Sequence, residues 1–304
     1  MSDRIIGRYT HGRKGPLVIV LAAIHGNEPA GVKALDYLFK MLEVEPITNP
    51  NFSFSGEIVG CIGNHKAYQL KKRFIDIDLN RIWQDNNSNS LLHHEYHEQK
   101  EIIDTISREI SKGKYSQIIL LDLHTTSSDG GIFVIPGQGQ KSLDIAKGLH
   151  APVILNMLHD IKGTIMDYYN EDRQGLPIHS LTFESGSHQD PLSVNRAIAA
   201  IINCMRYLSM VDHSDVESIH DDILQQYAKG LPKVSRLIYR HPIAINDDFR
   251  MNLGYHNFQM VEKNEKLAKH NGEEIISPHT ARILMPLYQK QGSEGFYIIE
   301  DIQS

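Results

Sequence analysis

The stretch Pro16-Leu-Val-Ile-Val-Leu-Ala-Ala-Ile-His-Gly-Asn-Glu28 determines most of the fold expected for this 304-residue chain. Its first nine residues are apolar, which is typical of a parallel strand that is covered on both faces. Pro29 follows at once, and proline suits the first helical position because a helix start leaves that N–H unpaired anyway. A helical pattern of apolar residues comes next, at Val32, Leu35, Leu38, Phe39 and Leu42. The segment therefore predicts a strand, a turn that carries His25 and Glu28, and a helix.

The chain up to about residue 210 continues this alternation of strand-like and helix-like segments. Further strands are expected at residues 56–63, 118–123, 131–137, 153–158 and 180–185. Further helices are expected at residues 91–111, 142–148 and 192–210, and the polar stretch 84–90 is expected to be a loop. Such alternation indicates an α/β sheet with parallel strands.

The last third of the chain has a different character. Residues 212–222 are acidic and polar, which fits a linker, and strand-like pieces follow at 234–239, 257–261, 281–288 and 295–299. The sequence therefore predicts a catalytic α/β domain over residues 1–211 and a smaller, mostly-β domain over residues 212–304.

His25, Glu28 and His124 form the residue set of a zinc site. His25 and Glu28 follow the first apolar run, and His124 ends the run Ile118 to Leu123. In open α/β sheets, ligands usually bind at the carboxyl ends of the strands. Two histidines and one carboxylate bind zinc in hydrolases and leave a fourth tetrahedral position for water. The His-x-x-Glu pattern alone is weak, because a histidine and a glutamate at a turn are usually solvated.

Three more segments complete the set of motifs that bear on function. They are Lys71-Lys-Arg-Phe-Ile-Asp-Ile-Asp-Leu-Asn-Arg81, Leu121-Asp-Leu-His-Thr-Thr-Ser127 and Leu181-Thr-Phe-Glu-Ser-Gly186. With His25-Gly-Asn-Glu28 they resemble, in order and separation, the aspartoacylase and succinylglutamate desuccinylase family of zinc deacylases. The resemblance covers about residues 17 to 190, and a weaker similarity occurs near Tyr288. It implies a carboxypeptidase A-like mixed α/β sheet flanked by helices, with a smaller mostly-β domain at the C-terminus.

Carried over position by position, the resemblance implies that one zinc ion per chain binds His25, Glu28 and His124. It also implies that Glu184 is the general base and that Arg73 polarises the scissile carbonyl. The chemistry requires these residue types, because an activated water needs a carboxylate to take its proton and an oxyanion needs a fixed donor.

Asn80 and Arg81 are implied to hold a carboxylate of the substrate. The planar guanidinium fork of arginine stays charged and binds a carboxylate with two hydrogen bonds. The other interpretation of Arg73 and Arg81 is a structural ion-pair network with Asp76 and Asp78.

Asp122 is expected to support the metal ligand His124. Residues two apart point to the same side of a strand, and a carboxylate that accepts a histidine N–H fixes the tautomer that binds metal. The alternative is that Asp122 pairs with nearby backbone donors, as aspartates at strand ends commonly do.

Four more residues are candidate substrate contacts in regions where the chain departs from the family. Arg173 lies near the place of a substrate-binding arginine of aspartoacylases but lacks its Thr-Arg-Ser context. Tyr168 follows the Gly163-Thr164 pair, and this segment resembles the desuccinylases more than the aspartoacylases. His188 follows the general-base motif and is equally consistent with a solvated loop histidine. Tyr288 is expected near the substrate, or else in the core with a wet hydroxyl.

The composition agrees with a cytoplasmic enzyme. The net charge of −6 and the pI of about 6.3 argue against a nucleic-acid partner. The run Leu17 to Ile24 is too short to span a membrane, and the first residues lack a signal-peptide core. Cys61 and Cys204 lie in apolar segments and are expected to be buried thiols.

Together these patterns predict a zinc-dependent amidohydrolase. It is expected to remove a short acyl group, of acetyl or succinyl type, from a small anionic N-acyl amino acid. The first alternative is a carboxypeptidase-like peptidase or amidase acting on a peptide or cell-wall fragment. The second is a non-catalytic homologue that binds an acyl amino acid, which Glu184 argues against because a binder needs no base. The acyl group, the amino acid and homo-oligomer formation stay open.

Overall fold

A computed structural model describes residues 4–84, 92–159, 161–170, 175–212, 219–244 and 246–302. The strands of the main sheet are β1 (Ile5–Thr10), β2 (Arg13–Ala22), β3 (Ser55–Ile62), β4 (Ile118–Thr126), β5 (Phe133–Pro136), β6 (Val153–Leu155), β7 (Ile178–Ser187), β8 (Val234–Pro242), β10 (Met260–Val261), β13 (Ala281–Leu284) and β14 (Glu294–Asp301). A second sheet contains β9 (Phe249–Met251), β11 (Lys266–His270) and β12 (Glu273–Ile276). The helices are α1 (Ala30–Thr48), α2 (His65–Gln69), α3 (His94–Ser111), α4 (Gln140–Gly148), α5 (Ile165–Tyr168), α7 (Leu192–Tyr207), α8 (Ile219–Ala228) and the 3₁₀ turn η1 (Leu79–Arg81).

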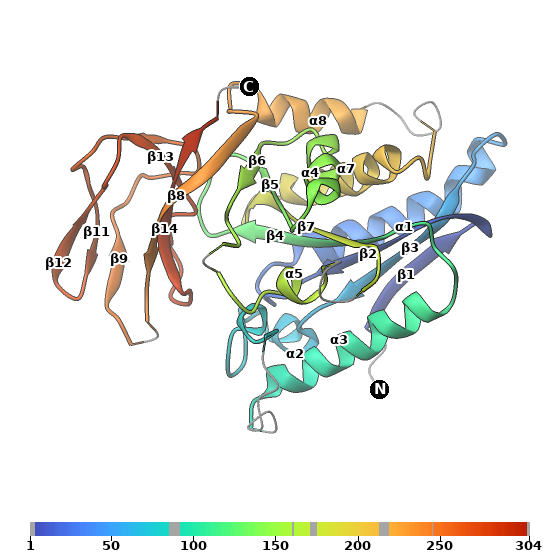
Figure 1. The fold of residues 1–304 in the computed structure, drawn as a ribbon, viewed down its shortest axis with the longest axis horizontal. Helices are drawn as coiled ribbons and strands as arrows, with labels where there is room; N and C mark the ends of the chain where they lie inside the picture. The colour runs from blue at the N-terminus through green and yellow to red at the C-terminus, as the bar shows by residue number, and fades with distance from the viewer. Residues whose placement is uncertain are drawn as a thin grey trace.

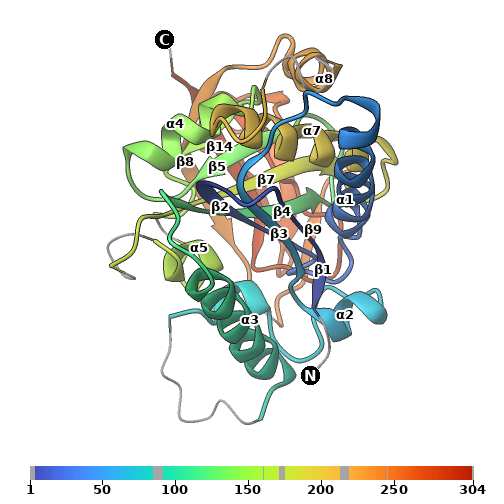
Figure 2. The ribbon, with the colours of Figure 1, turned by 90° about the vertical axis from the view of Figure 1, so that its right-hand side faces the viewer.

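The main sheet has eleven strands and is covered by helices on both faces (Figures 1 and 2). Its order is β1-β3-β2-β4-β7-β5-β6-β8-β14-β13-β10. Alternate side chains of β2 enter two different cores. Val18 and Val20 pack with α1 and α7, whereas Leu17 and Ile19 pack with α3 and α5. The continuous apolar run therefore arises because both faces of this strand are buried.

The sheet is mixed, which confirms the fold class and corrects the expectation of parallel strands throughout. Strands β2, β3, β4 and β7 are parallel, but β5 runs antiparallel to β7 and β1 runs antiparallel to β3. Only residues 127–132 separate β4 from β5, and a parallel crossover needs a dozen residues or more. The chain therefore reverses direction there.

The C-terminal region is rich in β-structure, as predicted, and its strands extend the main sheet beyond β6. Strand β8 pairs in parallel with β6, and β14, β13 and β10 follow it (orange and red in Figure 1). The predicted linker 212–222 is wrong at its end, because helix α8 starts at Ile219. Residues 213–218 lie outside the described part, as does most of the predicted loop 84–90. The domain boundary at residue 211 stays a prediction.

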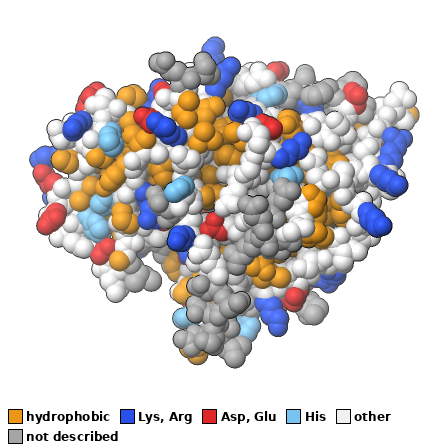
Figure 3. All heavy atoms as spheres, viewed as in Figure 1, with side chains coloured by type: hydrophobic (Ala, Val, Ile, Leu, Met, Phe, Trp, Pro, Cys, Tyr) orange, Lys and Arg blue, Asp and Glu red, His pale blue; other side chains and the backbone are white. Residues whose placement is uncertain are grey.

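The cysteines, the helices and the surface charges can be compared with what the composition predicts. Cys61 and Cys204 are both buried and are not joined in a disulfide. Among the helices of the described residues, none is long and apolar enough to cross a bilayer. On the face drawn in Figure 3, Lys and Arg side chains are interspersed with apolar and acidic ones.

Gly26 fixes the turn that carries His25 and Glu28. Its N–H donates to the carbonyl of Arg73 at 3.1 Å. A Cβ on Gly26 would overlap the backbone of Ala67 and Tyr68 in α2. Only glycine allows α2 to approach this closely, so the turn is held between α2 and the segment that carries Arg73.

A Gly26→Ala substitution should destabilise the protein, because backbone atoms cannot give way as a flexible side chain can. Overpacking of this kind costs about 1 to 3 kcal/mol in the free energy of unfolding. Urea unfolding measures the loss. Gly113→Ala is the matched control, since its Cβ would meet only the ring end of Tyr115. Equal stability of the two variants would contradict the close approach.

Candidate active site

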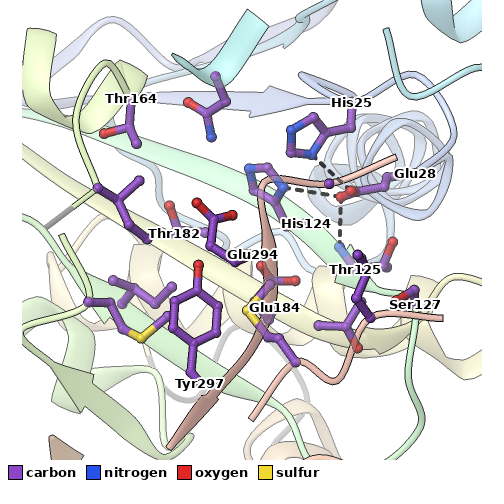
Figure 4. Close-up of a pocket in the computed structure, with 18 of the residues that line it drawn as sticks. His25, Glu28, His124, Thr125, Ser127, Thr164, Thr182, Glu184, Glu294 and Tyr297 are labelled. Atoms are coloured by element: carbon purple, nitrogen blue, oxygen red, sulfur yellow. Dashed lines mark hydrogen bonds and ion pairs between the residues drawn. The ribbon is translucent and has the colours of Figure 1, made fainter. Parts of the chain in front are cut away.

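Three neighbouring strands bring the predicted metal ligands and Glu184 to one edge of the sheet. His25 and Glu28 follow β2, His124 lies in β4 and Glu184 in β7. Strand β4 lies between β2 and β7, and His124 is directly opposite Glu184 in the register. These side chains, far apart in the sequence, therefore line one cavity (Figure 4).

The carboxylate of Glu28 joins the two histidines. Nδ1 of His25 lies 2.9 Å from Oε1 of Glu28, and Nδ1 of His124 lies 3.1 Å from Oε2. The backbone N–H of Thr125 donates to the same Oε2 at 2.9 Å. All three residues are buried, and their ligand atoms lie within 4.8 Å of one another.

The other ring nitrogen of each histidine contacts an aspartate. Nε2 of His124 lies 2.8 Å from Asp122, and Nε2 of His25 lies 3.2 Å from Asp78. A carboxylate at Nε2 holds the proton there and leaves Nδ1 as the metal-binding atom. Asp122 lies where the two-residue period placed it. Asp78 was considered only as an arginine partner, because no spacing rule links it to a histidine 53 residues away.

The charges of this cluster suit a divalent cation. Burial alone would raise the pKa of Glu28, but His25 and His124 hold it well below its usual value. Burial likewise opposes the protonation of His124, yet Asp122 and Glu28 raise its pKa well above the ordinary value. Two Nδ1 atoms and one ionised carboxylate, buried together, fit Zn²⁺ and its preference for nitrogen and oxygen ligands. A bound cation replaces the histidine proton.

Arg73 lies beside this cluster and lines the cavity. Its Nη2 is 3.1 Å from Oδ2 of Asp78, and its Nη1 is 3.6 Å from Oε1 of Glu28. The ion pair with Asp78 considered from the sequence is therefore present. Asp76 instead accepts the backbone N–H of His94 at 2.7 Å.

Glu184 is a buried acid with one carboxylate oxygen that has no hydrogen-bond partner among the described residues. Its side chain points into the cavity in Figure 4, and among the described residues its Oε2 makes no hydrogen bond. Burial raises its pKa to about 8. The alternative, an ion pair with an arginine inside the sheet, is not found in the described part of the chain. An unpaired buried carboxyl is costly, which marks Glu184 as a functional candidate.

Asn80 and Arg81 both reach the cavity, each with part of its hydrogen-bonding capacity already used. Oδ1 of Asn80 accepts the N–H of Ile165 at 3.0 Å. Nη2 of Arg81 lies 2.9 Å from Oε2 of Glu294, which belongs to β14. Sequence reasoning missed Glu294 and its neighbour Tyr297, which also lines the cavity. The sequence signal that could have identified Glu294 is an acidic residue at the start of an apolar, strand-like segment.

Of the other predicted substrate contacts, the three that the structure describes, Tyr168, His188 and Tyr288, are not among the residues that line this cavity. The hydroxyl of Tyr288 contacts the carbonyls of Asn252 and Tyr255, both at 3.0 Å. Tyr168, the last residue of α5, is half-buried and packs against the rings of Trp83 and Tyr169. His188 lies 2.6 Å from the hydroxyl of Thr125 and outside the cavity lining. Arg173 lies outside the described residues.

Comparisons with known proteins point to one family. Residues 14–208 match the family model of the succinylglutamate desuccinylase/aspartoacylase catalytic domain. A succinylglutamate desuccinylase of Pseudomonas fluorescens is 24% identical over 286 residues, which cover 88% of this chain and 78% of that protein. A probable aspartoacylase of Trichodesmium erythraeum is 32% identical over 120 residues, covering 38% and 37%.

A solved structure shares the fold. The crystal structure of a succinylglutamate desuccinylase/aspartoacylase from Rhodobacter sphaeroides superposes with a TM-score of 0.66 at 14% identity. The superposition covers 96% of this chain and 86% of that one.

The two aspartates behind the histidines should tune metal affinity. Asp78→Asn removes the charge that orients His25. The loss of such a partner typically weakens metal binding by about 10- to 100-fold. His124→Ala removes a ligand and should abolish stoichiometric Zn²⁺ binding. Elemental analysis and competition with a chelator measure both effects. Asp76→Asn, two residues away and off the cluster, is the control. Full zinc retention by the Asp78 and His124 variants would exclude this site.

Proposed function

Because the chain belongs to the succinylglutamate desuccinylase/aspartoacylase family, we propose that it is a zinc-dependent deacylase that hydrolyses a small N-acyl amino acid. The observation that carries the proposal is the unpaired Glu184 in one cavity with the cluster of His25, Glu28 and His124. This unpartnered carboxyl group beside three candidate metal ligands supports its assignment as the base. We also propose a cytoplasmic location, supported by two buried thiols that form no disulfide.

The proposed mechanism assigns one task to each side chain. His25, Glu28 and His124 would hold the zinc ion, which would supply the Lewis acidity that lowers the pKa of water and polarises a carbonyl. Glu184 takes a proton from the attacking water and returns it to the leaving amine. Its carboxylate is favoured beside a divalent cation, because opposite charge stabilises the ionised form.

Arg73 and Arg81 orient and stabilise the substrate in this mechanism. Arg73 donates to the oxygen of the scissile carbonyl as negative charge develops on it. Its ion pair with Asp78 holds the guanidinium in place for this task. Asn80 and the N–H groups of Arg81 that are not used within the protein hold the substrate carboxylate.

The shape of the cavity favours a small substrate over a peptide. Residues Met285, Leu287, Gln289 and Gly292, between β13 and β14, form part of its wall. The N–H of Tyr288 donates to Ser127 Oγ at 3.1 Å, and Asn27 donates to Gln289 at 3.0 Å. These contacts join the C-terminal segment to the strand ends that carry the ligands, which leaves a cavity of about 110 Å³.

A substrate screen tests the proposed function. Purified protein should release free amino acid from a panel of N-acetyl and N-succinyl amino acids. Treatment with a chelator should abolish the activity, and added Zn²⁺ should restore it, since little else holds the ion. Hydrolysis of peptides alone would favour the peptidase alternative. Substrate binding without any hydrolysis would favour the non-catalytic alternative.

Glu184→Gln separates the base from a structural role. The substitution keeps the side-chain volume and removes the proton acceptor, so kcat should fall by about 10² to 10⁴. Zinc content and thermal stability should stay near those of the wild type. If the stability falls and kcat does not, Glu184 is a structural residue.

A further inference from the structure

The ion pair of Arg81 and Glu294 faces the cavity from segments more than 200 positions apart. Oε2 of Glu294 lies 2.9 Å from Nη2 of Arg81 and accepts the hydroxyl of Ser293 at 2.7 Å. Oε1 lies 3.6 Å from Nη1 of Arg240. The side chain of Glu294 is only 9% exposed, and it points into the cavity beside Tyr297 in Figure 4. A carboxylate of the protein thus already lies beside the arginine proposed to hold the substrate.

The cavity offers few positive charges to a substrate. Apart from the two histidines and the zinc ion that they would hold, the cationic side chains among the described residues that line it are Arg73 and Arg81. Arg73 pairs with Asp78, and Arg81 pairs with Glu294. Arg81 also donates from Nε to Ser293 and from Nη1 to the carbonyl of Asn80. Since a guanidinium carries five N–H groups, two are left, which suffices for one carboxylate.

The remaining wall of the cavity is uncharged. One part of it is aliphatic and contains Ile135, Met157, Leu158, Ile161 and Met166, and another part carries neutral polar side chains such as Thr164, Thr182 and Gln289. A second carboxylate on the substrate would find no cationic partner in this part of the wall and would share the cavity with the carboxylate of Glu294. Both effects are unfavourable, because a charge that leaves water without a charged partner loses hydration and two like charges repel each other.

We propose that Glu294 determines substrate specificity by rejecting a second carboxylate. The preferred substrates are N-acyl amino acids whose single carboxylate is the α-carboxylate and whose other substituents are uncharged and apolar. Glu294 acts by occupying Arg81 and by placing its own negative charge in the cavity. The proposal rests on the deacylase function proposed above and narrows the class of substrate.

The substrate preference of the wild-type enzyme is the first test. The kcat/KM for N-acetyl-L-methionine should exceed the values for N-acetyl-L-aspartate and N-succinyl-L-glutamate by about tenfold or more, since like-charge contacts are costly. Higher values for either acidic substrate would overturn the specificity and leave the deacylase function intact. A preference for N-acetyl-L-lysine would also overturn it, because Glu294 would then attract a cation. No hydrolysis of any of these compounds would remove both proposals.

Glu294→Gln is the second test. The ratio of kcat/KM for the methionine substrate to that for the aspartate substrate should fall about tenfold or more, because the like charge is gone and Arg81 is released. A merely structural role would lower both values and leave the ratio unchanged, which would overturn the proposal. Glu300→Gln is the matched control, since Glu300 lies on the same strand and pairs with Arg236 at the surface. Its ratio should equal that of the wild type.

Binding without turnover gives a readout that does not depend on catalysis. Calorimetric titration of the zinc-loaded Glu184→Gln protein with the two uncleaved N-acetyl amino acids should show tighter binding of the methionine compound. Adding Glu294→Gln to this protein should shift the preference toward the aspartate compound by a similar factor. If the order of affinities is unchanged, Glu294 does not select the substrate.

Discussion

The structure of this site depends on one buried carboxylate, that of Glu28. It accepts the backbone N–H of Thr125 and lies against Nδ1 of both His25 and His124. A buried charge of this kind is tolerated only when several partners satisfy it. The partners come from β4 and from the turn after β2, so the pairing of these strands and the geometry of the site support each other.

Pairing of charges extends outward from this carboxylate through the rest of the cavity. Asp122 and Asp78 pair with the outer nitrogens of the two histidines, and Arg73 pairs with Asp78. Burial opposes the ionised form of Asp78, but His25 and Arg73 hold its pKa well below the usual value. Glu184 stands apart, because burial raises its pKa and its Oε2 has no partner in the described structure. The same cavity thus contains fixed charges that orient groups and one carboxyl that is suited to exchange a proton.

The C-terminal strands contribute to the cavity as well as to the sheet. Strand β14 places Glu294 and Tyr297 in the wall, and the segment before it is joined to Asn27 and Ser127 by hydrogen bonds. Strand ends of the α/β region thus carry the candidate metal ligands and Glu184, whereas the β-rich region forms the opposite wall of the cavity.

The sequence by itself determined the parts of the protein that depend on local pattern. The apolar run before His25 required a doubly covered strand, and the two-residue period placed Asp122 beside His124. The motifs around Glu28 and Glu184 predicted the candidate ligands and the candidate base, and the tertiary structure brings these residues to one cavity. The antiparallel course of β5 was missed, although the short connection before it contained the reason. Pairings between distant segments were decided only by the tertiary structure, because no periodicity relates residues 53 or 213 positions apart. Asp78 behind His25, Glu294 against Arg81 and the contact of the Tyr288 hydroxyl with Asn252 and Tyr255 all depend on how separate elements pack.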